Sequence, residues 1–249
     1  MKNCSGSNYT IESLNILSWL INMRFAIIFL KKIGSRYLIP LIGVWECFSD
    51  IDFALFPQKF VIKCTHVSGG IIVCKDKESF EVESARRKID HLLKRNFYYY
   101  AREWPYKNVH RRIIAEKYIV DDSTGELRDY KFFCFNGHCR CFKVDFDRFV
   151  EHRANYYDPQ GHLLDFGEKI CPPDSTKNIV LPENLAEMIS LAEKLSVGFP
   201  FLRVDLYDVN GKIYFGELTF FPASGFGEFT SEEWDERLGS WIELPRMKC

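Results

Sequence analysis

The sequence has almost no net charge, no long uninterrupted hydrophobic run and no low-complexity segment. Its 33 Lys and Arg residues balance 34 Asp and Glu residues, which leaves a formal net charge of −1. A chain without an overall basic field has no general attraction for nucleic acid or for an anionic membrane surface. Hydrophobic residues make up 47% of the 249 positions, and the 15 Gly and 10 Pro residues are spread out. A disordered or collagen-like chain is therefore excluded.

The most apolar stretch, residues 14–30, is interrupted by Asn15, Asn22 and Arg24. A membrane-spanning helix needs ~20 mostly apolar residues, and Arg24 would lie near the middle of this one. No small-residue cleavage site follows the stretch. We therefore expect neither a stable membrane span nor a signal peptide, and we expect a cytoplasmic protein.

The nine cysteines are odd in number and scattered, which favours a reducing compartment over a disulfide scaffold. Cys134, Cys139 and Cys141 surround a predicted Asn136-Gly137 turn and suggest a zinc site, with all three thiols on one face. A fourth ligand is missing because His138 would point to the other face. The three thiols are therefore predicted to be core residues.

Predicted strands and helices are mixed without regular alternation, which indicates an α+β fold with antiparallel sheets. Asp76 is predicted to cap a helix that starts at residue 77. The predicted strands are 60–64, 71–75, 112–119, 129–135, 138–145, 201–208 and 212–219, and the predicted helices are 13–33, 77–95 and 183–197.

Lys63 lies in a short apolar strand and is followed, five residues later, by Ser68, Gly69 and Gly70. Glycine lets backbone amides approach a phosphate closely, and a lysine ammonium supplies a charge for phosphate oxygens. The GxxxxGK[ST] pattern is absent, so this is not a P-loop. Taken alone, the pattern favours an ordinary hairpin with a solvated lysine.

Arg203 and Asp205 lie in one predicted strand, and Glu217 and Thr219 lie in the next. A carboxylate in a hydrophobic sheet needs a partner, because burying an unpaired charge is unfavourable. Two carboxylates and a hydroxyl on adjacent strands form a donor set that Mg²⁺ accepts. The alternative is a pair of exposed acids on an edge hairpin.

The turn between these two strands decides the metal hypothesis. A two-residue turn at 210–211 would place Glu217 on the opposite face from Asp205. A three-residue loop, 209–211, would place both acids on one face. Because Asp208 can open a type I turn and Gly211 can be a left-handed bulge, the metal hypothesis predicts this longer loop.

Glu116, Lys117, Tyr118 and Ile119 form the end of another apolar strand. Free backbone groups at such an end can bind the edge of an adenine, and a nearby glutamate can bind ribose hydroxyls. Taken alone, the segment favours a surface ion pair.

Together these blocks resemble the ATP-grasp superfamily, and within it the TupA-like ATP-grasp proteins of cell-surface polysaccharide biosynthesis. The resemblance covers about residues 33–245. It rests on Tyr37–Pro40, Phe60–Cys64, His66, Ser68–Gly69, Arg112–Tyr118, Asp129–Gly137, Phe199–Asp205 and Gly216–Pro222.

The resemblance implies two α+β subdomains, about residues 55–115 and 116–245, that clasp ATP within a domain of residues 35–249, after an N-terminal helical segment 1–34. Lys63 would hold the α/β phosphates, residues 68–70 would form a mobile cover, and residues 116–119 would bind adenine and ribose. Lys131 looks like the second phosphate-binding lysine. We expect Lys63, Lys131, Asp205 and Glu217 to converge on one nucleotide-sized cleft.

The resemblance also implies that Asp205 and Glu217 bind Mg²⁺ and that Arg203 stabilises a charged intermediate. The superfamily usually has Asn two residues after its metal-binding Glu, and Thr219 occupies that position here. A threonine hydroxyl is a shorter neutral ligand, so a second Mg²⁺ would be held more loosely or through water. The first 23 or so residues do not resemble the family's usual opening.

Asp145, Asp147, Arg148, His152 and Arg153 form a polar cluster after a predicted strand. The resemblance implies an acceptor-binding role for them, and a solvated loop is the alternative.

The implied activity is an ATP- and Mg-dependent carboxylate–amine ligase that works through an acyl phosphate. Its acceptor would be a carboxylate-bearing sugar or amino acid of the cell envelope. Two alternatives stay open, namely an ATP-grasp sugar phosphotransferase and a non-catalytic glycan-associated protein with a decayed ATP site.

Overall fold

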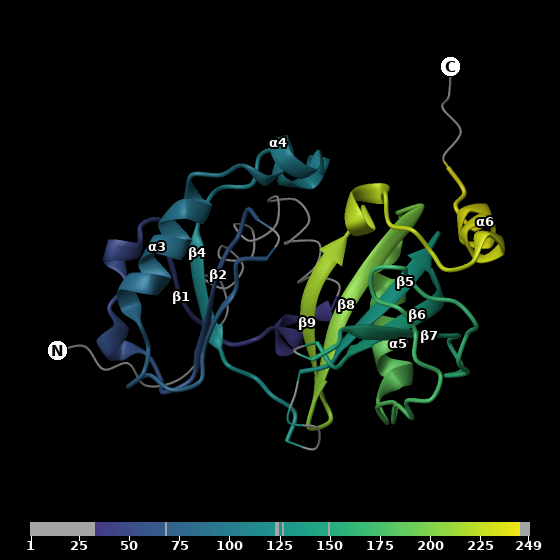
Figure 1. The fold of residues 1–249 in the computed structure, drawn as a ribbon, viewed down its shortest axis with the longest axis horizontal. Coiled ribbons are helices and arrows are strands. Elements are labelled where there is room, and N and C mark those ends of the chain that lie inside the picture. Colours follow the sequence, from purple (N-terminus) through teal and green to yellow (C-terminus); the bar gives the residue numbers. More distant parts are fainter. Residues whose placement is uncertain (1–32, 68, 123–124, 126, 149, 245–249) are drawn as a thin grey trace. The chain divides into compact units, whose positions relative to one another are not determined.

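The computed structural model describes residues 33–67, 69–122, 125, 127–148 and 150–244. The predicted helix 13–33 lies almost wholly outside these residues. The chain forms two compact units, unit 1 (Met1–Tyr118) and unit 2 (Ile119–Cys249) (Figure 1). Each unit is described by itself below. Among the described residues, none of the helices combines the length and the apolar character needed to cross a membrane.

The described part of unit 1 contains a four-stranded antiparallel sheet with strand order β1-β4-β2-β3. The strands are β1 (Leu41–Trp45), β2 (Phe60–Cys64), β3 (Ile72–Cys74) and β4 (Ile113–Lys117). One face packs against helix α3 (Val82–Leu93), and the short helix α4 (Phe97–Ala101) follows it (Figure 1). The core between sheet and α3 includes Phe60, Ile62 and Ile89, all completely buried.

The start of α3 differs from the prediction. The helix begins at Val82, with Glu81 as its N-cap residue. Asp76 instead accepts a hydrogen bond from the backbone N–H of Glu78 at 3.1 Å and shapes a turn. Phe80, just before the helix, packs edge-on against Phe60 with ring centroids 5.0 Å apart. This aromatic contact holds residues 77–80 against the core, outside the helix.

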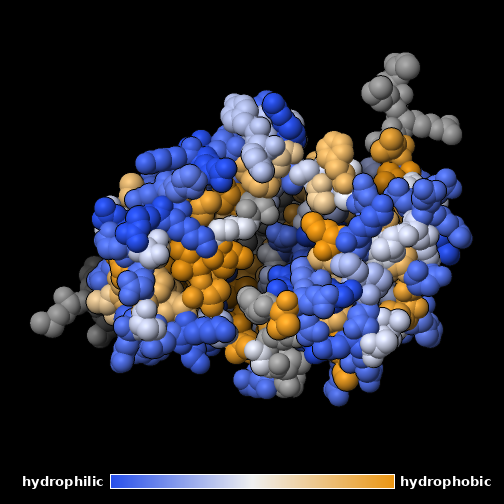
Figure 2. Space-filling view, in the orientation of Figure 1, coloured by the Kyte–Doolittle hydropathy of each residue, from blue (hydrophilic) through white to orange (hydrophobic). Residues whose placement is uncertain are grey.

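The described part of unit 2 contains a five-stranded antiparallel sheet with strand order β7-β6-β5-β8-β9. Its strands are β5 (Asp129–Phe135), β6 (His138–Phe146), β7 (Arg153–Tyr157), β8 (Phe201–Val209) and β9 (Lys212–Thr219). Helix α5 (Leu185–Ser196) buries Met188, Leu191 and Leu195, and it contacts β5, β6 and β8. Helix α6 (Glu232–Ser240) packs through Leu238 against a separate aromatic cluster. Figure 2 shows mostly hydrophilic residues on the visible surface of this unit.

The hairpins β5–β6 and β8–β9 share one construction. Each turns through two residues, Asn136-Gly137 and Asn210-Gly211, and all four residues have positive φ angles between 51° and 85°. Such angles define the type I′ turn, which matches the twist of the flanking strands. Each second strand then contains one extra residue, Arg140 in β6 and Gly216 in β9, where the pairing shifts by one.

The three-residue loop predicted for β8–β9 is therefore wrong, although Asp205 does lie directly opposite Glu217. The extra residue that brings them together is Gly216 within β9, not a residue of the turn. The bulge at Arg140 also corrects the cysteine prediction, because it places Cys141 opposite Phe133, whereas Cys139 lies opposite Cys134 on the other face. Core positions for the three thiols are confirmed, with exposed fractions of 0% to 6%.

The seven predicted strands and the helices near 77–95 and 183–197 are confirmed, with shifted ends. Strand β3 keeps only three of five predicted residues, and β4 keeps five of eight. Strands β1 and β7 were not predicted. Every residue of β1 is only partly buried, so it lacks the alternation that predicts a strand. Short 3-10 helices span Ser35–Tyr37, Phe48–Asp50, Phe53–Leu55, Trp104–Tyr106 and Pro222–Gly225.

Candidate active site

Four charged side chains lie side by side across the sheet of unit 2. Lys143, Lys131, Asp205 and Glu217 occupy directly paired positions on β6, β5, β8 and β9. Directly paired residues of antiparallel strands share a face and have adjacent side chains. We call these four residues the charged row. Both bulges are needed to form it, because without them Lys143 and Glu217 would point to the α5 face.

Lys131 lies at the centre of the row and is only 8% exposed. Its Nζ atom donates to Asp205 Oδ2 at 2.7 Å and to Asp129 Oδ2 at 3.3 Å, and it lies 3.6 Å from Asp145 Oδ2. Burial opposes the charged form, but Asp205 and Asp129 outweigh it and raise the pKa of Lys131. The ammonium is therefore a fixed positive charge held by carboxylates of three strands.

Asp205 is 1% exposed and both of its oxygens are bound. Arg203 Nε donates to Oδ1 at 2.8 Å, and Arg203 Nη2 donates to Oδ2 at 2.8 Å. Burial opposes ionisation of this carboxyl, but the charges of Arg203 and Lys131 outweigh it and lower the pKa of Asp205. Asp205 therefore positions both cations in the described conformation.

Glu217 is the carboxylate of the row that solvent reaches, with 52% of its side chain exposed. It accepts hydrogen bonds from Arg203 Nη2 at 2.9 Å and from Thr219 Oγ1 at 3.3 Å. Partial desolvation and the negative charge of Asp205 raise the pKa of Glu217. Three hard oxygen donors, from Asp205, Glu217 and Thr219, thus lie on two adjacent strands.

This donor set fits Mg²⁺ that arrives with a nucleotide. No cluster of three or more His, Cys, Asp or Glu side chains able to hold a metal occurs in the described part of the chain. Mg²⁺ in ATP sites is commonly bound by one or two carboxylates, with phosphate oxygens and water completing the octahedron. Glu217 and Thr219 could offer oxygen ligands to such an ion, whereas both oxygens of Asp205 are hydrogen-bonded to other side chains.

Asp129 and Glu168 extend the charged row and, like Lys143, were not singled out from the sequence. Arg148, from the predicted polar cluster, joins it as well. Arg148 Nη2 donates to Asp145 Oδ2 at 2.8 Å and also contacts Asp129. Lys143 Nζ donates to Glu168 Oε2 at 2.6 Å. The sequence signal that could have revealed these residues is the alternation of charged and apolar residues in segments 129–131 and 143–145. Their alignment depends on the bulge at Arg140, which periodicity does not reveal.

The polar cluster predicted to bind an acceptor divides into two groups. Asp145 is 3% exposed, and its Oδ1 lies 3.5 Å from His152 Nε2, so both residues join the charged row. Asp147 instead pairs with Lys177 at 2.8 Å, and Arg153 pairs with Glu151. A wholly solvated loop is therefore excluded for Asp145, and the acceptor role of the cluster stays a prediction.

In unit 1, Lys63 Nζ lies 2.7 Å from Glu116 Oε2, with the two side chains 29% and 13% exposed. They lie on the adjacent strands β2 and β4, on the face opposite the core residues Phe60 and Ile62. The ion pair expected for Glu116 is thus present. Strand β4 ends at Lys117, so Tyr118 and Ile119 follow it as irregular backbone at the boundary between the units.

The glycine turn between β2 and β3 contacts the C-terminal end of helix α3. His66 Nε2 lies 3.0 Å from the carbonyl oxygen of Leu92. Gly69 and Gly70 have φ angles of +79° and +72°, and a Cβ on Gly70 would lie 2.4 Å from Leu92 Cδ1. The left-handed conformation therefore favours glycine at position 70, and a side chain there would also displace the end of Leu92. Ser68 lies outside the described residues.

The two antiparallel α+β units, with a lysine beside a glycine turn in one and the charged row in the other, define an ATP-grasp fold. The family model described as TupA-like ATPgrasp matches residues 21–243. The chain therefore belongs to the TupA-like ATP-grasp family.

Solved structures similar to this chain include the D-alanine–D-alanine ligase from Bacillus anthracis, with 18% sequence identity and a TM-score of 0.47, where the match covers 89% of this chain and 68% of that one. The D-alanine–D-alanine ligase from Helicobacter pylori has 14% sequence identity and a TM-score of 0.48, and the match covers 92% of this chain and 62% of that one. Another is the ATP-grasp ligase PsnB complexed with minimal precursor, Mg and ADP, with 10% sequence identity and a TM-score of 0.41, where the match covers 95% of this chain and 62% of that one. The chain thus spans 62% to 68% of the length of these structures. No curated protein matches it.

Proposed function

We propose that this protein is an ATP- and Mg-dependent ligase that joins a carboxylate to an amine through an acyl phosphate. The observation that carries the proposal is the charged row together with Arg203. Asp205 accepts hydrogen bonds from Lys131 and Arg203, and Arg203 also donates to Glu217. Phosphoryl transfer needs positioned cations and oxygen ligands more than acid–base groups. The row supplies both.

In the proposed reaction, a carboxylate oxygen of the acceptor attacks the γ-phosphorus of ATP, and the bond to the β–γ bridging oxygen breaks to release ADP. The amine nitrogen then attacks the acyl carbon, phosphate leaves, and the amine loses a proton. Lys131 binds the transferred phosphoryl group, and Arg203 donates to the oxygens of the tetrahedral carbon. Bound Mg²⁺ would neutralise phosphate charge next to Glu217, Asp205 and Thr219.

The family resemblance assigns further nucleotide-binding roles to residues 63, 68–70 and 116–119. Lys63 would bind the α/β phosphates once its ion pair with Glu116 opens, and Glu116 would then bind ribose hydroxyls. Lys117, Tyr118 and Ile119 would contact adenine through backbone groups, and Ser68, Gly69 and Gly70 would cover the phosphates. The sequence resemblance to the family supports these roles.

We propose a carboxylate-bearing sugar or amino acid of the cell envelope as acceptor, with Asp145, Asp147, His152 and Arg153 on its side of the site. The sequence resemblance to polysaccharide-biosynthesis proteins supports this assignment. A cytoplasmic location agrees with the need for ATP.

The test is release of ADP and phosphate from ATP against a panel of envelope sugars and amino acids. A ligase releases both products together, whereas a sugar phosphotransferase leaves the phosphoryl group on the acceptor.

We expect Arg203→Ala to keep Mg-ATP binding but lose turnover, and Glu217→Gln to weaken the Mg²⁺ dependence. Thermal unfolding with and without Mg-ATP reports binding separately, because a ligand at a hundred times its Kd stabilises a fold by ~2.7 kcal/mol. Turnover retained by Arg203→Ala would contradict the ligase mechanism.

A further inference from the structure

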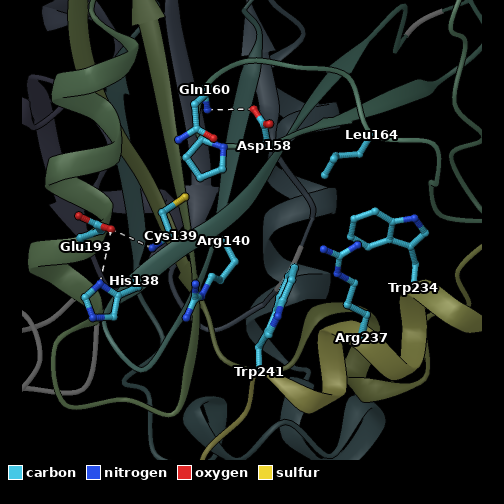
Figure 3. A pocket seen from close by; sticks show the side chains of 11 residues that line it. His138, Cys139, Arg140, Asp158, Gln160, Leu164, Glu193, Trp234, Arg237 and Trp241 are labelled. Carbon is cyan, nitrogen blue, oxygen red and sulfur yellow. Dashed lines mark hydrogen bonds and ion pairs between the residues drawn. The ribbon is translucent and has the colours of Figure 1, made fainter.

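Unit 2 contains a pocket of about 750 Å³ that none of the proposed ligase residues lines. It lies at the turn end of the β5–β6 hairpin, between helix α6 and the loop 158–164 (Figure 3). Its rim is open, since the His138 side chain is 72% exposed. A pocket of this volume can hold one sugar ring or a similar small group.

The pocket presents two guanidinium groups, Arg140 and Arg237, on either side of the Trp241 ring (Figure 3). Arg140 is the bulge residue of β6 and is exposed. Within the described residues, neither arginine has a carboxylate partner; Arg237 packs over the Trp234 ring, with its Cζ 4.6 Å from the centroid. Guanidinium groups in this position favour a planar anion such as a carboxylate or phosphate.

The two acidic residues of the pocket are already satisfied by other groups. Asp158 accepts from the backbone N–H of Gln160 and from His162 Nδ1, both at 2.9 Å. Glu193 accepts from the backbone N–H of Cys139 at 3.1 Å and lies 4.0 Å from His138 Nδ1. The two carboxylates are thus turned toward these partners, whereas the two guanidinium groups are not paired with a carboxylate among the described residues.

The aromatic rings of the pocket are held in place by contacts outside it. Trp234 stacks on Phe166 with centroids 4.3 Å apart, and its Nε1 donates to Asp165 at 2.7 Å. Trp241 packs edge-on against Phe135, and its carbonyl oxygen accepts from Asn136 at 2.8 Å. Fixed, half-buried indole rings offer a flat apolar surface to a ligand at little cost in conformational entropy.

We propose that this pocket binds an anionic sugar, meaning a pyranose ring that carries a carboxylate or a phosphate. The apolar face of the ring would pack on Trp241, and the anionic group would accept hydrogen bonds from Arg140 and Arg237. Gln160 and His138, at the rim, are placed to bind hydroxyl groups. Arg237 already packs over the Trp234 and Trp241 rings, and its guanidinium has no carboxylate partner among the described residues. An anionic ring would contact both guanidiniums and the fixed indole at once.

The site is separate from the charged row but lies in the same unit. Arg140 and Lys143 are three residues apart on β6, which corresponds to ~10 Å along a strand. Cys141 and Phe142, which lie between them, are completely buried, so the pocket and the charged row are not joined along the surface of β6. The inference goes beyond the proposed ligase activity, because binding here requires neither ATP nor Mg²⁺.

The test is calorimetric titration of the full-length protein, without ATP or Mg²⁺, with a hexuronate trisaccharide, with a sugar phosphate and with a neutral trisaccharide of equal length. We expect binding of at least one anionic probe, none of the neutral one, and a change in tryptophan fluorescence. Arg140→Gln should weaken binding about tenfold, the effect of losing one charge-assisted hydrogen bond. Because Arg140 is exposed, the variant should fold normally.

Arg86→Gln, at an exposed arginine of α3 in unit 1, is the matched control and should bind like the parent protein. Equal binding of the neutral sugar, tighter binding of AMP than of every sugar, unchanged affinity in Arg140→Gln, or no binding at all would overturn the proposal. If the parent protein binds the sugar but shows no ATP turnover, the ligase assignment is contradicted and the sugar-binding proposal is not.

Discussion

At the scale of single residues, Arg203 is the side chain on which the candidate site depends most. It contacts Asp205 through two nitrogens and Glu217 through one, and only 12% of its side chain is exposed. Removing one member of a buried ion pair leaves an uncompensated charge, which is strongly destabilising. Arg203 therefore has a structural role in addition to its proposed catalytic one.

We predict that Arg203→Met lowers the free energy of unfolding by roughly 3–5 kcal/mol, the range found when a buried pair is broken. Arg86→Met, which removes an exposed partner of Glu83 and Asp90, should change it by less than about 1 kcal/mol. Urea unfolding of both variants measures the difference. Similar effects in the two variants would show that the pair with Asp205 is not coupled to folding.

At the scale of elements, the two hairpins of unit 2 place the charged row by means of their bulges. Gly216 is one bulge residue, and a Cβ there would lie 3.1 Å from both the carbonyl oxygen of Asp205 and the ring of Tyr207. Contacts this short force backbone or ring to move. The absence of a side chain at this position therefore keeps Glu217 in register with Asp205.

We predict that Gly216→Ala destabilises the protein by about 1–3 kcal/mol through overpacking and weakens any Mg-ATP stabilisation. Gly239→Ala in helix α6 meets nothing within 4 Å, so it should instead stabilise by up to about 1 kcal/mol, since alanine is the better helix former. Thermal unfolding of the two variants checks whether their stabilities change in opposite directions. A neutral Gly216→Ala would mean that β9 accommodates the methyl group without a register change.

The sequence predicted the strands of both hairpins, because alternation and Asn-Gly turns are local signals. It also singled out Lys131, Arg203, Asp205 and Glu217, which lie side by side in unit 2. The sequence did not predict which residues pair across neighbouring strands. Counting from Asn136-Gly137 without a bulge would pair Lys131 with Phe142, so Lys143 and Asp129 were missed and Asp145 was assigned only to the polar cluster. The pocket beside α6 was missed for the same reason, since its residues come from segments a hundred positions apart.

At the scale of the whole molecule, the two units have separate cores, and one buried histidine makes unit 1 sensitive to acid. His66 is 2% exposed, its Nδ1 has no hydrogen-bond partner among the residues that the structure describes, and burial lowers its pKa below 6.5. The unfolded chain then binds a proton that the folded chain does not. Stability is therefore full above about pH 6.5 and falls as the pH drops below that value, down to the folded pKa.

We predict that unfolding of unit 1 shifts to lower temperature between pH 7.5 and pH 5.5, and that His66→Gln flattens this dependence. His138→Gln, at an exposed histidine of unit 2, should leave the slope unchanged. Calorimetric scans at several pH values test this. An equal slope in His66→Gln and the parent protein would assign the acid sensitivity to other groups.

The inserted residues in β6 and β9 also bear on how such a site can be kept among relatives. Each inserted residue is left out of the pairing, so deleting its codon would give a regular hairpin in which Lys143 still pairs with Lys131 and Glu217 with Asp205. Relatives with a gap at position 140 or 216 can therefore keep the arrangement of the charged row, and this can be read from their genes alone.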